Sequence, residues 1–206
     1  MFAGLKSFFC RNETLNPINV SNVEEHNSTY KLGADLIGPQ MMLHGRHLKI
    51  TNKGKRDIQK GIHCLQAVTV FNPANWNAFW IMGKGYQAMG EHRQAYQNFK
   101  KAYEIEHINP NVPREFAESC MQLGYGPEAV TIAIGAVEAA PNDAGLHANL
   151  ALAYLISNEN SYAQKSIQYA LDLDPEDQIS QRLQKFINEV IAGKRVQPKN
   201  LSDLQG

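Results

Sequence analysis

The stretch from Pro141 to Pro175, PNDAGLHANLALAYLISNENSYAQKSIQYALDLDP, decides the fold of this chain. Its two prolines stand 34 residues apart, and Pro73 lies 68 residues before Pro141, which is twice that spacing. Within the stretch, apolar and small residues follow a helical period, and Asn158-Glu159-Asn160 mark a turn between two helices. Two helices that return at a fixed period indicate a stack of helix pairs.

The same period governs the residues that precede positions 73, 107, 141 and 175, which we call the repeat positions. Twelve residues before each repeat position stands a small residue. Eight residues before it stands a mostly bulkier apolar residue, and five before it another apolar or small residue. These sets are Gly61, Ala95, Ala129 and Ala163; Leu65, Phe99, Ala133 and Ile167; and Val68, Ala102, Ala136 and Ala170. The first helix of the later pairs shows Met82-Gly83, Phe116-Ala117 and Leu150-Ala151, followed three residues on by Tyr86, Cys120 and Tyr154. From about residue 42 to 175 the chain therefore resembles the tetratricopeptide-repeat (TPR) family, whose Leu-Gly, Tyr, Ala, Phe, Ala, Pro signature occupies these positions.

The resemblance implies an all-α fold, a TPR-like α-solenoid of about four helix-turn-helix repeats with a C-terminal capping helix. The helix pairs are predicted at 40–51 and 56–71, 75–89 and 92–107, 112–123 and 127–139, and 143–156 and 160–173. The capping helix is predicted at 176–192, where apolar residues repeat at three and four. The predicted domain organisation is an N-terminal segment and polar linker (1–39), the solenoid (40–192) and a polar tail (193–206).

Departures from the repeat carry further expectations. His107 stands where a repeat proline is expected, so the preceding helix is predicted to run long, up to the turn at Asn109-Pro110. The first repeat is degenerate in its first helix, and its turn is expected at Asn52-Lys53-Gly54. Asp143 and Asp174 are predicted to cap the helices that follow them.

The N-terminal region has no repeat character. Residues 2–10 place Phe2, Leu5, Phe8 and Phe9 on one side of a short amphipathic turn, which leaves two alternatives open: a stub that docks on the body or stays loose, or an anchor for a partner or a membrane surface. Residues 11–29 are rich in Asn, Ser, Thr and Glu, which is typical of a linker, and 30–37 is expected to form a short helix ended by Gly38-Pro39.

Composition narrows the function classes. The 206 residues carry 20 basic and 20 acidic side chains, and a net charge of zero argues against a nucleic-acid partner. Cys10, Cys64 and Cys120 lack metal-finger spacing, which favours buried thiols in a reducing compartment. Since no apolar run approaches a membrane span and the start lacks a signal-peptide pattern, a cytoplasmic location without an integral membrane part is predicted.

No residue pattern predicts catalysis, a metal or a cofactor. His44 and His47 share a helix side but have no third ligand nearby, so solvated histidines are expected. His63 and Cys64 are adjacent on a helix and point about 100 degrees apart, which prevents a nucleophile-base pair. Gly83-Lys84-Gly85 lacks the rest of a phosphate loop. An enzyme is therefore not predicted.

The first helices of stacked pairs line a concave groove, and their positions outside the core are predicted to face a partner. Trp80, Lys84, Arg114 and Met121 are the predicted contacts, with Arg46 and Lys53 at the rim. Trp and Arg are favoured interface anchors. We expect a protein-protein interaction module, an adaptor or scaffold, that binds an extended or helical peptide with apolar anchors and some acidic character. The Lys and Asn clamp with which some TPR proteins hold a C-terminal carboxylate is not reproduced, because Ile50, Ile81, Asn111 and Glu115 occupy its slots.

A second resemblance, over about 35 residues, is to cytoplasmic chaperones of type III secretion translocators. It rests on Gln87-Ala88-Met89-Gly90, Ala95, Pro110, Pro113 and Phe116-Ala117-Glu118-Ser119-Cys120, although this chain has one more repeat and a longer polar N-terminal region. It implies, as the alternative function, a chaperone of an exported protein. A further alternative is a homo-oligomer in which the N-terminal segment of one copy occupies the groove of another.

Overall fold

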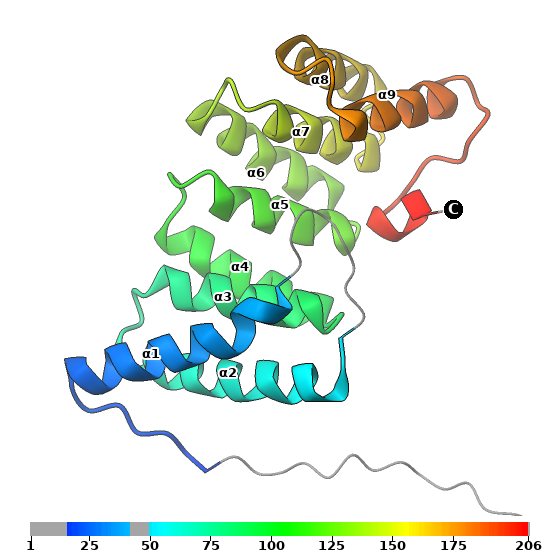
Figure 1. Cartoon of the computed structure of the whole chain (residues 1–206). Coiled ribbons are helices and arrows are strands. Elements are labelled where there is room, and N and C mark those ends of the chain that lie inside the picture. Colours follow the sequence, from blue (N-terminus) through cyan, green and yellow to red (C-terminus); the bar gives the residue numbers. More distant parts are fainter. Residues whose placement is uncertain (1–15, 42–49, 206) are drawn as a thin grey trace, which may run out of the picture.

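The computed structural model describes residues 16–41 and 50–205, and within them all regular secondary structure is helical (Figure 1). The α-helices are α1 (Val23–Ile37), α2 (Asn52–Phe71), α3 (Trp76–Ala88), α4 (His92–Ile105), α5 (Asn111–Gln122), α6 (Gly126–Ala139), α7 (Ala144–Ile156), α8 (Asn160–Leu173) and α9 (Gln178–Ile191). The 3₁₀ helix η1 (Gly38–Gln40) follows α1, and the 3₁₀ helix η2 (Leu201–Gln205) comes after α9.

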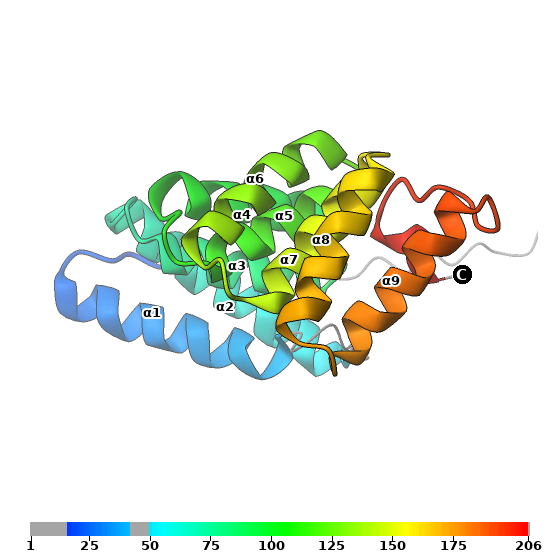
Figure 2. The same cartoon turned by 90° about the horizontal axis from the view of Figure 1, so that it is seen from above.

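The helices pack in sequential antiparallel pairs. The most extensive contacts join α1 to α2, α3 to α4, α5 to α6 and α7 to α8, and α9 packs against α8 and α7. We call the first member of each pair the A helix and the second the B helix. The predicted solenoid of about four helix pairs with a C-terminal capping helix is confirmed, and Figures 1 and 2 show the pairs stacked in chain order.

The 34-residue register governs where the B helices end. They end at Phe71, Ile105, Ala139 and Leu173, each two residues before the repeat position. Since α4 obeys the same register, the expected extension of that helix to His107 is wrong. Glu106 explains the stop, because its carboxylate accepts hydrogen bonds from the backbone N–H groups of Ile108 (2.8 Å) and Asn109 (3.0 Å).

The turns between A and B helices repeat with the same period. Gly90, Gly124 and Asn158 each adopt a left-handed backbone, with φ of 76°, 77° and 64°. A left-handed residue just after a helix redirects the chain, and glycine and asparagine take that conformation at least cost. The breaks between the predicted helices, at 90–91, 124–126 and 157–159, are confirmed.

The small residues of the repeat allow the close helix contacts that they predicted. Ala95, Ala129 and Ala163 are all buried in their B helices. Gly83 of α3 lies directly against the ring of Phe99, where a Cβ atom would come within 2.6 Å of the ring. The buried side chains form three successive clusters along the stack, as a chain of nearest-neighbour contacts requires.

The first pair departs from the prediction, because its A helix is α1 and not 40–51. Residues 41, 50 and 51 are not helical, and 42–49 lie outside the described residues. The expected linker is instead helical from residue 23, because Asn22 caps α1 by accepting from the N–H of Glu25 at 2.9 Å. Gly33 and Gly61 face each other across α1 and α2, so the two backbones approach closely.

Two further local expectations are corrected. The predicted turn at 52–54 is the first turn of α2, because the side chain of Thr51 accepts from the N–H of Gly54 at 3.1 Å. Asp143 does cap α7 (3.1 Å to the N–H of Leu146), but α9 is capped by Asp177 and not by Asp174. Asp174 ends α8, since its N–H still bonds to the carbonyl of Ala170.

The residues after α9 are not a loose polar tail. Pro198 is buried, and Leu201 and Leu204 pack against the second half of the solenoid. Figure 1 shows this segment, in red, returning from α9 toward the end of α5. Among the described residues, no helix is both long and apolar enough to cross a lipid bilayer.

Candidate functional site

The A helices form the inner face of the stack. Among the described residues, α1 touches α3, α5 touches α7, and α7 touches the capping helix α9, whereas no contact of that extent joins α3 to α5 or any two successive B helices. Helices on the inner side of a curved stack lie closer together than those on the outer side, so α3, α5 and α7 line the concave face. Figure 2 shows α1 and α9 on one side of the molecule and α4 and α6 on the other.

A buried ion pair links α3 to α5 on this face. The ammonium group of Lys84 donates to both carboxylate oxygens of Glu115, at 3.0 and 2.9 Å, and the two side chains are only 8% and 14% exposed. Two charges that are so little exposed to water are stable only as a pair, because each has lost most of its hydration. Lys84, a predicted partner contact, is therefore already paired with Glu115.

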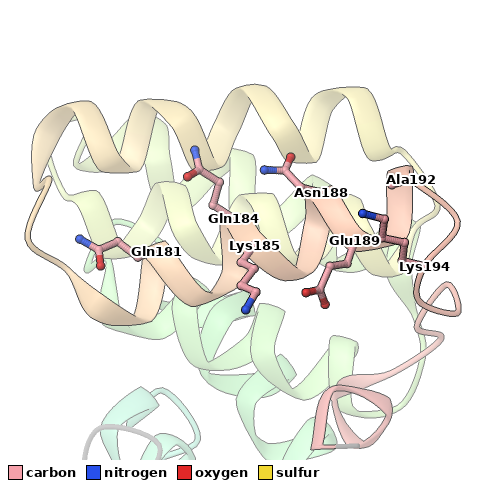
Figure 3. A pocket seen from close by; sticks show the side chains of 7 residues that line it. All are labelled: Gln181, Gln184, Lys185, Asn188, Glu189, Ala192 and Lys194. Carbon is pink, nitrogen blue, oxygen red and sulfur yellow. The ribbon is translucent and has the colours of Figure 1, made fainter.

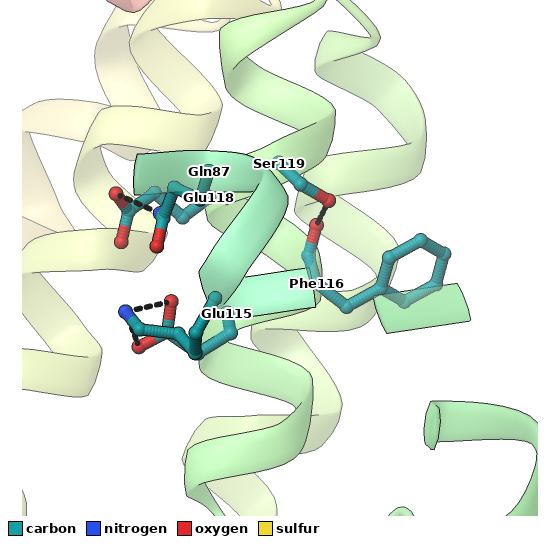
Figure 4. Close-up of polar contacts among 6 residues, drawn as sticks. Gln87, Glu115, Phe116, Glu118 and Ser119 are labelled. Carbon is teal, nitrogen blue, oxygen red and sulfur yellow. Dashed lines mark hydrogen bonds and ion pairs between the residues drawn. The ribbon is translucent and has the colours of Figure 1, made fainter. Parts of the chain in front are cut away.

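A second polar contact lies one helical turn further along both helices. The Gln87 amide donates to Glu118 at 3.1 Å (Figure 4). Burial raises the pKa of Glu118 to about 7, the neighbouring charge of Glu115 adds to the rise, and Lys84 and Arg114 oppose it. The central part of the face thus holds a carboxylate that resists ionisation at neutral pH.

Arg114 extends the network to α7. Its Nη2 donates to a carboxylate oxygen of Asp143 at 2.8 Å, and both side chains are about one third exposed. Since Asp143 also caps α7, one carboxylate holds both the helix start and the neighbouring repeat. On this face the two cations Lys84 and Arg114 therefore lie beside three carboxyl groups, those of Glu115, Glu118 and Asp143.

Trp80 is half-buried beside this network, where it packs against the core clusters of both halves of the stack. The Lys84 ammonium lies 5.9 Å from the centre of its ring. The indole Nε1 of Trp80, Oε1 of Gln87 and Nε of Arg114 are buried without a hydrogen-bond partner. Such groups are costly in a folded protein, and three of them gather here.

We call Trp80, Lys84, Gln87, Arg114, Glu115 and Glu118 the central cluster. The predicted contacts Trp80, Lys84 and Arg114 belong to it, so the structure brings these three together on α3 and α5. The sequence prediction missed the role of Glu115 and Glu118. Both contacts between the helices join residues 31 positions apart (84 with 115, 87 with 118), which is one repeat less one helical turn. A search for complementary polar residues at that separation finds them.

Two predicted contacts lie elsewhere, and a third lies outside the described residues. Met121 is 1% exposed, because it belongs to the core cluster against which Leu201 packs, so its side chain is covered in this structure and does not lie on the open surface. Lys53 is exposed in the first turn of α2, a B helix, and not in a turn at the rim of the groove where it was expected. Arg46 lies outside the described residues, as do Cys10, His44 and His47.

Other parts of the described chain offer less. Cys64 and Cys120 are buried free thiols as predicted, and burial raises the pKa of both, which keeps them unreactive. A shallow depression on the exposed side of α9 is lined by Gln181, Gln184, Lys185, Asn188, Glu189, Ala192 and Lys194 (Figure 3). These are the polar side chains of an end helix, and no apolar anchor lies among them.

Comparison with known proteins identifies the fold through structure alone. No protein-family model matches the chain, and no curated protein matches its sequence. Among solved structures, MamA (41-end) from Desulfovibrio magneticus RS-1 is 16% identical, with 82% of this chain and 86% of that chain covered at a TM-score of 0.68. YrrB, described as a TPR protein with an unusual peptide-binding site, is 14% identical over 65% and 74%, at 0.57. The first TPR of Spaghetti (RPAP3), bound to the HSP90 peptide SRMEEVD, is 18% identical over 57% and 93%, at 0.53. The chain has the TPR helical-repeat fold.

Proposed function

We propose that this chain is a protein-protein interaction module, an adaptor or scaffold, that holds a segment of a partner protein on the concave face of α3, α5 and α7. The observation that carries the proposal is the central cluster, where the half-buried Trp80 and its neighbours Gln87 and Arg114 each bury one polar atom without a hydrogen-bond partner. A small rotation of Trp80 or Gln87 would bring these groups to a bound backbone. That YrrB and the RPAP3 domain are described with a peptide-binding site and a bound peptide supports the choice.

The ion pairs revise the expected chemistry of the partner. Both cations of the central cluster are paired with carboxylates of the chain, so they offer little to an acidic peptide. The charged form of Glu118 lacks such a cation partner, since the only hydrogen bond to Glu118 among the described residues comes from the neutral side-chain amide of Gln87. A Lys or Arg of the partner placed at Glu118 would stabilise its charged form. The proposed partner segment therefore combines an apolar anchor for Trp80 with a basic residue.

The experiment is partner capture by the purified chain, with two aromatic-to-alanine substitutions, one on an A helix and one on a B helix. Trp80→Ala removes the proposed anchor, whereas Tyr162→Ala removes an aromatic side chain that is 53% exposed on α8, a B helix. We expect a partner that wild type and Tyr162→Ala retain and that Trp80→Ala loses, with helicity unchanged in both variants. Retention by Trp80→Ala would refute the proposed site. The nature of the partner then separates an adaptor from the export-chaperone alternative, which requires a single exported protein that becomes insoluble without this chain.

A further inference from the structure

The segment that follows α9 packs back on the solenoid in the manner of a bound peptide. We call residues 195–205 the tail segment. It is joined to α9 by the exposed residues 192–194, in which Gly193 has a left-handed backbone with φ of 68°. The Arg195 guanidinium lies 4.5 Å from the ring centre of Phe186 and pairs with Glu189 at 3.0 Å, which directs the segment away from the axis of α9.

The first part of the tail segment binds the end of α7. The side-chain amide of Gln197 donates to the main-chain carbonyl of Leu155, and its oxygen accepts from Asn160 at 2.9 Å. This carbonyl, in the last turn of α7, also accepts from the backbone N–H of Asn158 at 3.0 Å, so Gln197 uses its second lone pair. Pro198, the next residue, is buried.

The second part binds the end of α5 through two apolar side chains and one hydrogen bond. Leu201 packs against the core cluster that contains Met121, and Leu204 against the cluster that contains Leu155. The amide of Gln122 donates to the hydroxyl of Ser202 at 3.1 Å. Met121 was expected to face the groove, yet Met121 and Leu155 are only 1% and 0% exposed.

The tail segment also holds its own shape. The Asp203 carboxylate accepts from the N–H groups of Lys199 (2.7 Å) and Asn200 (3.3 Å), and the Asn200 side chain accepts from the N–H of Ser202 (2.8 Å). These bonds form the short turn η2 and place Leu201 and Leu204 three residues apart on one side. A preorganised segment loses less entropy when it docks.

We infer that the ends of α5 and α7 form a peptide-binding subsite that the tail segment occupies from within the same chain. The subsite comprises Met121, Gln122, Leu155 and Asn160. It accepts an amide side chain and a proline, followed by two leucine-like residues three positions apart. A partner segment of that pattern displaces the tail segment, and this reading rests on the proposed function because it concerns the same inner layer of A helices.

A synthetic peptide of residues 195–206, RVQPKNLSDLQG, tests the inference. It carries a fluorophore, and its anisotropy is titrated with the full chain and with the Leu201→Ala/Leu204→Ala variant, whose own tail segment lacks both anchors. A tethered segment competes at an effective concentration on the order of 1 mM. For a peptide Kd of about 0.1 mM, we therefore expect wild type to bind about tenfold more weakly than the variant. Equal binding by the two proteins, or none by the variant, overturns the inference.

Two controls keep the result interpretable. The same peptide with both leucines replaced by alanine must not bind the variant. The second control, hydrogen exchange, uses the wild-type chain and needs no substitution. A displaceable segment opens without unfolding the stack, so the backbone amides of 199–203 must exchange at least about 100-fold faster than those in the core of α5. Exchange of both regions together overturns the inference. If the peptide does not bind the variant but partner capture is still lost in Trp80→Ala, only the subsite is refuted. If the peptide binds the variant but Trp80→Ala still captures the partner, the proposed central site is refuted.

Discussion

Replacing Glu118 with glutamine is expected to stabilise the protein at neutral and alkaline pH. The pKa of Glu118 stands at about 7 against an ordinary value of 4.5, and since each unit corresponds to about 1.4 kcal/mol, the charged form costs at most about 3 to 4 kcal/mol. The side chain is only half-buried, so solvent screening lowers this figure, and we expect a gain of roughly 1 to 3 kcal/mol for Glu118→Gln at pH 8. Glutamine keeps an oxygen that accepts from Gln87.

The sign of the pH dependence follows from the raised pKa. Between pH 4.5 and 7 the folded protein binds more protons at Glu118 than the unfolded chain does, so this group makes the folded state less stable as pH rises through that window. Above about pH 7 the loss is complete. Glu118→Gln removes this component, and the difference in stability between variant and wild type must therefore grow from pH 5 to pH 8.

Urea denaturation followed by circular dichroism at pH 5, 6, 7 and 8 measures both effects. The matched control is Glu128→Gln, on the B helix α6, where a carboxylate accepts from the Tyr96 hydroxyl at 3.0 Å outside the central cluster. A Glu118→Gln variant that is less stable than wild type at pH 8, or whose advantage does not change with pH, would refute the electrostatic reasoning.

Three other substitutions test the packing and the network. Lys84→Met leaves the nearly buried carboxylate of Glu115 without its cation, so we expect a loss of about 3 to 5 kcal/mol in urea denaturation; a loss under 1 kcal/mol would mean that water solvates the pair. Asp143→Ala removes the α7 cap and the carboxylate paired with Arg114, and we expect a loss of stability of about 1 to 2 kcal/mol. This loss corresponds to a melting temperature lower by about 2 to 8 °C. An unchanged melting temperature would contradict the two roles assigned to Asp143. Gly83→Leu places a side chain where the ring of Phe99 lies, and we expect a loss of at least about 1 to 3 kcal/mol, which a folded variant of wild-type stability would disprove.

The repeat period predicted the solenoid because every repeat obeys the same local packing rule. It placed the ends of α2, α6 and α8 and the turns after α3, α5 and α7. Helix α4 also ends in register, at Ile105, although the missing proline at His107 had suggested a longer helix. It failed in the first pair, because the connection between α1 and α2 is much longer than the turns of the other pairs and puts the A helix outside the register. The sequence of α1, VEEHNSTYKLGADLI, carries many polar residues and so gives a weak apolar pattern for a helix. The start of α1 is set instead by its N-terminal cap at Asn22.

The candidate site was only partly predictable for a related reason. Groove positions follow from the period, so Trp80, Lys84 and Arg114 could be placed on the inner face. Whether such a residue is free depends on what reaches it from other helices. Lys84 is taken by a carboxylate 31 residues away, and the groove position of Met121 is buried in a core cluster that Leu201 helps to cover. Periodicity contains no information on contacts made by a segment outside the repeats.

The return of the chain end to α5 changes how the stack unfolds. In a solenoid each repeat contacts only its neighbours, so the terminal helices can melt one after another without disturbing the rest. The hydrogen bond between Gln122 and Ser202 spans 80 residues and bridges α6 to α9, which makes melting of the last repeats depend on the same contacts. The C-terminal half should therefore open as one cooperative unit while the tail segment is docked, and as separate steps once a partner has displaced it.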